Sequence, residues 1–365
     1  MTLEELRARL NTVDRQLVEL IAERQALSKK VAEAKRTSKL PTRDFKRERE
    51  VLLRARASAT ELGISPDLTE SILRMLIRGS LTTQEREQVA AGNRGSGRTA
   101  LVIGGAGKMG GWFSEFLASQ GYRVSINDPS GTVPGFEHVP DWARTPLDFD
   151  LIVVATPLAV GNSVLQQLAE HRPRGVIFDL GSLKTPLRQG LQALRDAGCK
   201  VTSVHPMFGP DTELLSGRHV IFVDMGNEEA LHAAQDLFSA TMAERAVMTL
   251  DEHDRLIAYV LGLSHALNIA FFTALAESGE AAPRLAQLSS TTYDAQVDVA
   301  TRVSVENPEL YFEIQSLNEY GRESLQALRS SVERLWQAVA QQDQATFVRL
   351  MQQGREYLAG RVRER

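Results

Sequence analysis

Two basic side chains interrupt an apolar stripe near the start of the chain. Leucines and valines step by three and four residues from Leu3, and the same stepping continues through Arg24, Leu27 and Val31. A guanidinium in such a stripe is costly unless an anion or a carboxylate meets it. Lys35 returns to the same helix face three turns later, roughly 16 Å away. The two cations therefore predict a site for one small dianion.

Further polar side chains have the types and spacing to complete this site. Guanidinium forks suit carboxylates better than ammonium groups do, and polar residues four positions apart share one helix face. The residues of these two kinds are Arg7, Arg47, Ser80 and Gln84. The alternative is that Arg24 forms a partly buried ion pair with Glu48 and that the other charges lie on the surface.

A glycine-rich turn follows a short apolar run at 101–103 and has the spacing G-x-G-x-x-G. Glycines at these positions let a pyrophosphate approach the backbone at a helix N-terminus. A second strand over 122–127 ends at Asp128, whose carboxylate would accept a hydrogen bond from a ribose 2′-hydroxyl and repel a 2′-phosphate. The pattern predicts NAD as cofactor. The expected binding residues are Gly105, Gly107, Lys108, Met109, Gly110, Asp128, Thr156 and Pro157.

Polar side chains also follow later strands, at the sheet edge where open α/β sheets bind ligands. Ser182 and Lys184 follow one strand, and His205 follows another and is flanked by prolines, which indicates a positioned side chain. His253 and His265 in the helical tail are intermediate candidates. The remaining histidines have no comparable setting and are expected on the surface or in packing. No cluster of His, Cys and carboxylates has metal-ligand spacing, so we predict no metal.

The elements that position these residues change along the chain. Residues 3–37 contain no Gly or Pro and predict one helix about 50 Å long. That length exceeds a compact domain of this size, so a partner chain is expected to share its apolar seam. Two more helices are predicted over 44–61 and 67–91. Short β-branched runs then alternate with helical stretches, as buried parallel strands do; they lie at 101–103, 151–154, 176–178 and 220–223.

From about residue 250 onward only helical patterns occur. We therefore predict an all-α domain over 1–91, a short flexible linker over 92–98, an α/β Rossmann-type NAD-binding domain over 99–249, and an all-α domain over 250–365. The last domain is expected to contribute to substrate binding and to dimer formation.

Composition limits the classes of protein that fit. Hydrophobic residues make up 43% and charged residues 24% of the chain, which excludes dominant disorder and fibrous repeats. The single cysteine, Cys199, fits a reducing compartment. The N-terminus is acidic where a signal peptide is basic, and no apolar stretch approaches the roughly 18–20 residues that span a bilayer. We expect a cytoplasmic protein without a membrane partner.

Charge is distributed unevenly. Residues 1–91 hold 18 Lys and Arg against 14 Asp and Glu, a net charge of +4, whereas the remainder carries −8. A basic helical arm could bind nucleic acid. The position of Arg24 within an apolar stripe indicates an enclosed side chain instead, so we expect no nucleic-acid partner.

The helical head resembles the all-helical chorismate mutases over about residues 3–90. Eight residues carry the resemblance in order and spacing, and the stretch 42–49 is its most specific part; the eight are Arg7, Arg24, Lys35, Asp44, Arg47, Glu48, Ser80 and Gln84. The resemblance implies two intertwined chains, with Arg7 lent to the partner's site. It also implies that the arginines clamp carboxylates, that Lys35 and Gln84 donate to the ether oxygen, and that Glu48, with Asp44, binds the substrate hydroxyl.

The remainder, over about residues 99–355, resembles the prephenate dehydrogenases. The resemblance is carried by Asp179-x-x-Ser182-x-Lys184, by the loop from His205 to Pro210, by Glu252-His253-Asp254 and by Arg302. It implies that His205 accepts the proton of the substrate's ring hydroxyl while Ser182 orients that group. It further implies that Arg302 binds a substrate carboxylate, that His265 lies in the pocket, and that Lys184 helps to hold substrate or cofactor.

Fused in this order, the two parts resemble the bifunctional chorismate mutase/prephenate dehydrogenases of tyrosine biosynthesis. The resemblance implies conversion of chorismate to prephenate, followed by NAD-dependent oxidative decarboxylation of prephenate to 4-hydroxyphenylpyruvate. It also implies a homodimer and inhibition by tyrosine. One alternative is a dehydrogenase that oxidises arogenate behind the same mutase head, and another is a head that only regulates the dehydrogenase.

Overall fold

The computed structural model describes residues 1–38 and 40–360. They fall into two compact units. The first unit contains the helical head and most of the α/β region; its segments are Met1–Thr156, Ser163–Gly181 and Gly190–Met248. The second contains the helical tail from Thr249 onward together with two short segments, Pro157–Asn162 and Ser182–Gln189.

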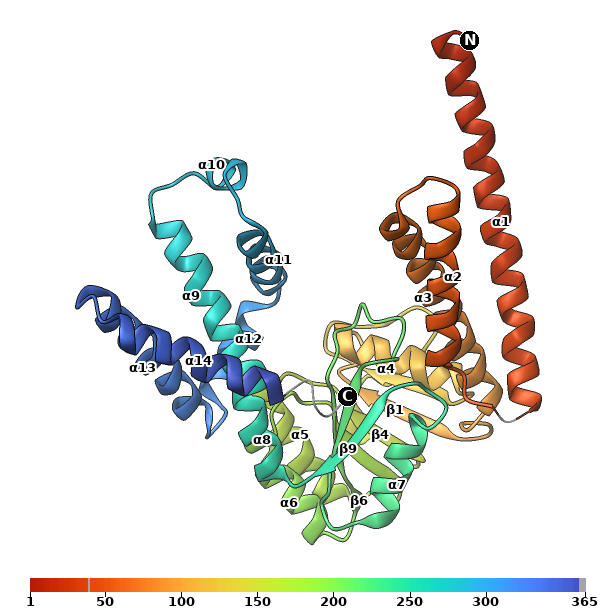
Figure 1. The fold of residues 1–365 in the computed structure, drawn as a ribbon. Coiled ribbons are helices and arrows are strands. Elements are labelled where there is room, and N and C mark those ends of the chain that lie inside the picture. The colour runs from red at the N-terminus through yellow and green to blue at the C-terminus, as the bar shows by residue number, and fades with distance from the viewer. Residues whose placement is uncertain (39, 361–365) are drawn as a thin grey trace. The chain divides into compact units, whose positions relative to one another are not determined.

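The head consists of three helices, α1 (Leu3–Thr37), α2 (Phe45–Glu61) and α3 (Pro66–Gly92). Each begins after a capping side chain: Thr2, Asp44 and Ser65 accept hydrogen bonds from backbone amides of the first turns, which lack helical partners. The three predicted helices are confirmed. Figure 1 shows α1 extending well beyond α2 and α3.

The apolar seam of α1 is largely uncovered in the single chain. Leu3, Leu10 and Leu17 are each more than half exposed, and Ala32 is the one buried residue of α1. Full burial of such a side chain stabilises a protein by about 1.5–3 kcal/mol. The seam is therefore available to a second copy of the chain.

A six-stranded parallel sheet forms the centre of the α/β region, in the order β3-β2-β1-β4-β5-β6. The strands are β1 (Thr99–Ile103), β2 (Arg123–Asn127), β3 (Glu137–His138), β4 (Leu151–Val154), β5 (Val176–Asp179) and β6 (Lys200–Val201). The order reverses between β1 and β4, where sheets of this type bind dinucleotides. The predicted Rossmann-type domain is confirmed.

A second sheet was not expected. It contains β7 (Ser203–Pro206), β8 (His219–Val223) and β9 (Glu244–Met248). The run 220–223, which we expected among the parallel strands of the main sheet, pairs antiparallel with β7 and parallel with β9. Local sequence does not distinguish these arrangements because both leave the strand buried on two faces.

Helices α4 (Lys108–Ser119), α5 (Leu158–His171), α6 (Arg188–Asp196) and α7 (Glu228–Leu237) accompany the strands. Aromatic side chains from several elements meet in the core of the first unit. Phe113 packs edge-on against Phe178 and near Phe238, with ring centroids 5.6 and 6.1 Å apart. All three are at most 1% exposed.

The segment 92–98 differs from the expected flexible linker. Helix α3 continues to Gly92, and the following turn is hydrogen-bonded, with the Gly95 amide donating to the Gln120 carbonyl at 2.8 Å. A Cβ on Gly95 would collide with Tyr122. The head is thus joined to the α/β domain by a packed turn.

The tail is helical from α8 (Leu250–Ile257) onward. A π-helical segment, Ala258–Leu263, links α8 to α9 (Ser264–Glu277), and five helices follow: α10 (Ala282–Gln287), α11 (Thr291–Ser304), α12 (Pro308–Ser316), α13 (Gly321–Ala340) and α14 (Gln344–Gly360). By length and composition alone, the continuous helix 250–277 is apolar enough to cross a membrane. This corrects the expectation that no such stretch exists.

Candidate active sites

A cavity of about 260 Å³ lies in the head among α1, α2 and α3. It is lined by all of the predicted mutase residues except Arg7, namely Arg24, Lys35, Asp44, Arg47, Glu48, Ser80 and Gln84. Apolar side chains, including Val31 and Leu81, form the rest of its wall. Residues that lie 60 positions apart in the sequence therefore share one small polar cavity.

Arg24 is the central cation of this cavity. Its Nη1 donates to Ser80 Oγ at 3.0 Å and to the Leu76 carbonyl at 3.1 Å. Burial lowers the pKa of its guanidinium. Arg24 forms no ion pair within residues 1–38 and 40–360, so the alternative in which Glu48 neutralises it is wrong. Its charge is oriented but not compensated by a carboxylate.

Glu48 is paired with a different cation. Arg43 Nε and Nη2 donate to its two carboxylate oxygens at 2.9 and 3.0 Å. Such a fork-to-fork pair fixes both groups. Arg43 was not among the predicted site residues, although it lies within the specific stretch 42–49 and five residues before Glu48.

The two expected donors to the ether oxygen are both anchored. Lys35 Nζ donates to the Thr42 carbonyl at 2.8 Å, and Gln84 Nε2 donates to Ser28 Oγ at 2.7 Å. Gln84 Oε1 is buried and has no partner among the atoms of the described chain. The cavity thus contains an unsatisfied polar atom, as a ligand site does.

The remaining predicted residues have peripheral positions. Asp44 caps α2 through the Arg47 amide, and the Arg47 guanidinium, which is more than half exposed, lies 3.3 Å from Glu50. Arg7 is exposed and precedes Arg24 on α1 by 17 residues, about 25 Å along the helix. It does not line the cavity of its own chain.

Two glycines of the turn between β1 and α4 have no room for a side chain. A Cβ on Gly110 would collide with the Gly104 carbonyl, and one on Gly105 would collide with Ile126. Gly107 is the N-cap residue of α4, which begins with Lys108. This backbone surface at a helix N-terminus fits a pyrophosphate.

Asp128 lies directly over this turn. Its carboxylate accepts hydrogen bonds from the Ala106 amide at 3.0 Å and from the amide and hydroxyl of Ser130 at 2.9 and 2.5 Å. Burial raises the pKa of Asp128, but these hydrogen bonds outweigh it and keep the pKa below its usual value. Thr156 follows β4, and its buried Oγ1 has no partner in the described chain. The carboxylate, the glycines and this hydroxyl fit a dinucleotide.

His205 lies on β7, opposite Ile221 of β8, and is 4% exposed. The strand continues into the loop at Met207, whose amide donates to the His219 carbonyl at 2.9 Å. His205 thus lies on a strand that is regularly paired with β8, and its side chain is almost fully buried.

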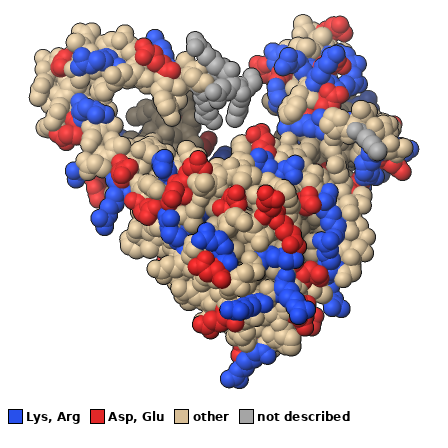
Figure 2. All heavy atoms as spheres, turned by 90° about the horizontal axis from the view of Figure 1, so that it is seen from below, with Lys and Arg blue, Asp and Glu red and all other residues tan. Residues whose placement is uncertain are grey.

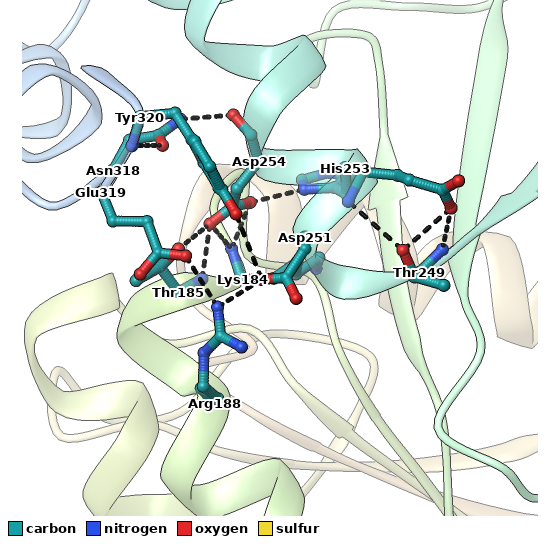
Figure 3. Close-up of polar contacts among 11 residues, drawn as sticks. Lys184, Thr185, Arg188, Thr249, Asp251, His253, Asp254, Asn318, Glu319 and Tyr320 are labelled. Atoms are coloured by element: carbon teal, nitrogen blue, oxygen red, sulfur yellow. Dashed lines mark hydrogen bonds and ion pairs between the residues drawn. The ribbon is translucent and has the colours of Figure 1, made fainter. Parts of the chain in front are cut away.

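In the second unit, the segment that carries Ser182 and Lys184 is held by a buried carboxylate. Asp254 accepts hydrogen bonds from the amides of Lys184 and Thr185 at 2.9 and 2.5 Å, and lies 2.6 Å from His253 Nδ1. Figure 3 shows these groups converging on Asp254. Burial raises the pKa of Asp254, but the hydrogen bonds from His253 and Thr185 outweigh it and lower the pKa.

His253 and Asp254 connect three segments of the second unit. Asp254 and His253 are fully buried, and Asn318 donates to the Asp254 carbonyl at 2.8 Å. The pair thus joins α8 to the 182–187 segment and to the turn before α13. Ser182 Oγ is buried without a partner in the described chain, so it is available to a ligand.

His265 and Arg302 lie on α9 and α11, which pack together and are joined by the Gln296–Asn268 hydrogen bond at 2.9 Å. The His265 ring stacks on Tyr311 at 4.0 Å, and burial lowers the pKa of its imidazole. Arg302 is exposed. No group of three or more His, Cys, Asp or Glu that could bind a metal occurs in the described parts of the chain.

Comparison with known families decides the identity. The family described as "Chorismate mutase type II" matches residues 6–85, "Prephenate dehydrogenase, nucleotide-binding domain" matches 135–247, and "Prephenate dehydrogenase, dimerization domain" matches 249–353. A "T-protein" of Enterobacter agglomerans is 29% identical over 349 residues, which cover 94% of this chain and 89% of that protein. This chain belongs to the bifunctional chorismate mutase/prephenate dehydrogenases.

Relatives of each half agree with this assignment. The "4-amino-4-deoxyprephenate dehydrogenase" of Streptomyces pristinaespiralis is 30% identical over 261 residues, which cover 68% of this chain and 88% of that protein. The "Chorismate mutase" of Methanocaldococcus jannaschii is 31% identical over 84 residues, 23% of this chain and 85% of that protein. Both halves of the bifunctional enzyme are therefore present, and its cofactor is NAD.

Solved structures show the same dehydrogenase fold. A prephenate dehydrogenase from A. aeolicus, in complex with hydroxyphenyl propionate and NAD+, aligns with a TM-score of 0.55 and 18% identity, covering 73% of this chain and 98% of that one. An arogenate dehydrogenase of Synechocystis aligns with a TM-score of 0.55 and 19% identity, and the alignment covers 72% of this chain and 99% of that one. At these identities the alignments support the fold alone.

Proposed function

We propose that the cavity of the head rearranges chorismate and that the residues around His205 and the glycine turn oxidise the resulting prephenate. The observation that supports the first assignment is the uncompensated charge of Arg24 in a cavity with Lys35, Glu48 and Gln84. The rearrangement needs no nucleophile and no proton transfer. A site that folds a flexible dicarboxylate and stabilises charge on the breaking ether bond is sufficient.

The roles within this cavity are those that the resemblance implies, and the lining residues support them. Arg24, oriented by Ser80, binds one substrate carboxylate, and Arg47 at the rim binds the other. Lys35 of α1 and Gln84 of α3 both line the cavity and stabilise the negative charge that develops on the ether oxygen. Glu48 accepts a hydrogen bond from the substrate hydroxyl, with Asp44 nearby.

We also propose a homodimer in which α1 of each chain crosses its partner. The exposed leucine seam and the distance of Arg7 from its own cavity support this arrangement. Arg7 then completes the partner's site, at the open side of the cavity. The tail, whose sequence matches a family of dimerization domains, would add a second interface that covers the apolar surface of α9.

In the dehydrogenase, the glycine turn would hold the pyrophosphate through Gly105, Gly107 and Gly110. Lys108 and Met109, at the start of α4, would contact the same cofactor, as would Thr156 and Pro157 after β4. Asp128 would bind the ribose hydroxyls. When bound, NAD supplies the hydride acceptor. His205 accepts the proton of the ring hydroxyl as that carbon loses hydride, and the electron pair left by departing CO2 makes the ring aromatic.

The remaining assignments concern binding. Ser182, whose hydroxyl has no partner in the described chain, orients the ring hydroxyl, and Lys184 supports the same segment. Arg302 binds a substrate carboxylate, and His265 contributes a neutral ring to the pocket. Tyrosine, which is similar in shape to the aromatic product, would act as a feedback inhibitor. Free, buried Cys199 is consistent with a cytoplasmic location.

One assay tests both assignments together. The full chain is mixed with chorismate and NAD, and chorismate loss and NADH formation are followed in the same sample. We expect chorismate to disappear whether or not NAD is present, and NADH to form only after prephenate accumulates. Faster NADH formation from arogenate than from prephenate would reverse the substrate assignment, and no loss of chorismate would exclude the mutase.

A further inference from the structure

The head and the α/β domain, both in the first unit, are joined through the buried carboxylate of Glu85. This residue is 4% exposed and lies directly after Gln84 on α3. Its Oε2 accepts a hydrogen bond from the Leu215 amide at 2.7 Å and its Oε1 from the Met242 amide at 2.5 Å. The loop before β8 is therefore fixed against the mutase helices.

The same loop contacts the mutase site through a serine. Ser216, the residue after Leu215, accepts a hydrogen bond at its Oγ from Arg43 Nη1 at 2.6 Å. The other two nitrogens of this guanidinium, Nε and Nη2, bind both oxygens of Glu48. The guanidinium also lies over the Phe45 ring, 4.3 Å from its centroid. All three nitrogens of Arg43 thus have a defined partner.

Glu48 stands in the wall between two cavities. It lines the mutase cavity and also a second cavity of about 340 Å³, and Ile77 and Leu81 do the same. The far side of the second cavity is formed by the α/β domain, with Leu214, Ser216, Gly217 and Arg218. Glu48, the carboxylate assigned to the substrate hydroxyl, therefore shares the second cavity with residues of the α/β domain.

We propose that Arg43 and Ser216 are positioning residues for the mutase reaction, so that the dehydrogenase domain fixes the orientation of Glu48. The proposal rests on the proposed role of Glu48. A free carboxylate would sample several rotamers, whereas the Arg43 fork holds both of its oxygens in one. The hydrogen bond from Arg43 to Ser216 in turn restrains the long Arg43 side chain. It keeps Arg43, and the Glu48 carboxylate bound to it, from moving into the second cavity. One residue of the mutase site, Glu48, is thereby aligned through Arg43 by a residue of the dehydrogenase half.

The first experiment compares Ser216→Ala with Ser216→Thr in the full chain. Removing the hydroxyl leaves Arg43 paired but mobile, so the mutase kcat should fall about three- to tenfold, with a smaller change in KM. Threonine keeps the hydroxyl, and its methyl group has space in the second cavity, so it should restore kcat. Dehydrogenase kcat/KM with prephenate should stay at the wild-type value in both variants, which controls for folding.

A double-mutant cycle then tests the connection between the two residues. Arg43→Lys keeps the charge but loses the fork, and should lower the mutase kcat by about tenfold or more. If Ser216 acts through Arg43, adding Ser216→Ala to Arg43→Lys should cost little more. Losses that simply multiply would overturn the connection.

A third variant separates failure of this inference from failure of the proposed function. Glu48→Gln should lower the mutase kcat strongly. Wild-type turnover in that variant would remove Glu48 from the reaction and the positioning proposal with it. An impaired Glu48→Gln beside a Ser216→Ala variant of unchanged mutase kcat would overturn the positioning proposal alone.

Discussion

At the scale of single residues, each site depends on groups that are held in place before a ligand arrives. Arg24 is oriented by Ser80, and Asp128 by Ser130 and the Ala106 amide. A group that is already oriented does not have to be reorganised as charge develops in the reaction. Arg24 forms no ion pair in the described residues, whereas Arg43 and Arg47 lie beside Glu48 and Glu50.

Replacing the fixed imidazole tests the dehydrogenase at this scale. His205→Asn should retain NAD binding, because the glycine turn is untouched, and should lose about 10²–10⁴ in kcat for prephenate oxidation. Binding is measured by titrating NAD, and oxidation by NADH absorbance. Turnover close to that of the wild type would remove His205 from the mechanism.

Asp128 provides a second prediction at the residue scale. A carboxylate beside the ribose repels a 2′-phosphate, so Asp128→Ala should lower the ratio of kcat/KM for NAD over NADP by about tenfold or more. Both cofactors are compared with prephenate at saturation. An unchanged ratio would show that another residue discriminates between the two cofactors.

At the scale of elements, apolar periodicity and the absence of Gly and Pro predicted the long first helix of the head, because both signals are local. Contacts between distant segments have no such local signal. The pairing of β8 with β7 and β9, the packed turn at Gly95 and the role of Arg43 all depend on residues far away in the chain. The predicted mutase residues other than Arg7 line one cavity, and their role there stays a prediction, whereas Asp254 was noted only as part of a motif.

The buried Asp254 carboxylate allows a prediction with a definite pH dependence. Asp254→Asn should lower the free energy of unfolding by about 3 kcal/mol at pH 7, since the amide cannot accept the same hydrogen bonds. The pKa of Asp254 is lowered in the folded chain. The ionised carboxylate therefore stabilises the folded chain above the unfolded-state pKa of about 3.9. This stabilisation is lost as the pH falls through the lower folded-state pKa.

Calorimetric unfolding of the variant and the wild type checks this dependence. The difference between them should be constant from pH 7 to about pH 5 and should shrink below about pH 4. Asp298→Asn, at an exposed position of α11, is the matched control and should change stability by less than about 0.5 kcal/mol. A difference that persists unchanged at the lowest pH would show that the Asp254 charge is not responsible.

At the scale of the whole molecule, the uncovered apolar surfaces support the proposed dimer. The seam of α1 and the apolar helix 250–277 are both largely exposed in the single chain. On the face shown in Figure 2, acidic and basic side chains are interspersed, and Lys and Arg gather on the helical head at the upper right. A dimer that shares α1 would bring Arg7 of each chain to its partner's cavity.

Mixing two inactive variants tests this sharing directly. Arg7→Ala and Arg24→Ala should each abolish most mutase activity as homodimers. In a heterodimer one site is doubly damaged and the other has both arginines, so an equimolar mixture after subunit exchange should regain about a quarter of wild-type activity. A mixture that stays as inactive as its components would mean that Arg7 acts in its own chain, and an active Arg7→Ala homodimer would mean that Arg7 has no role in the site.

The most direct measurement is the binding of a bicyclic dicarboxylate, shaped like the folded substrate, to the full-length chain. Titration calorimetry should show one site per chain, competitive with chorismate, and NAD affinity should be unaffected by its presence. Arg24→Ala should abolish this binding, while the exposed control Arg54→Ala should retain it. Absence of binding to the wild type, or equal binding to Arg24→Ala, would contradict the assignment of the head as the mutase site.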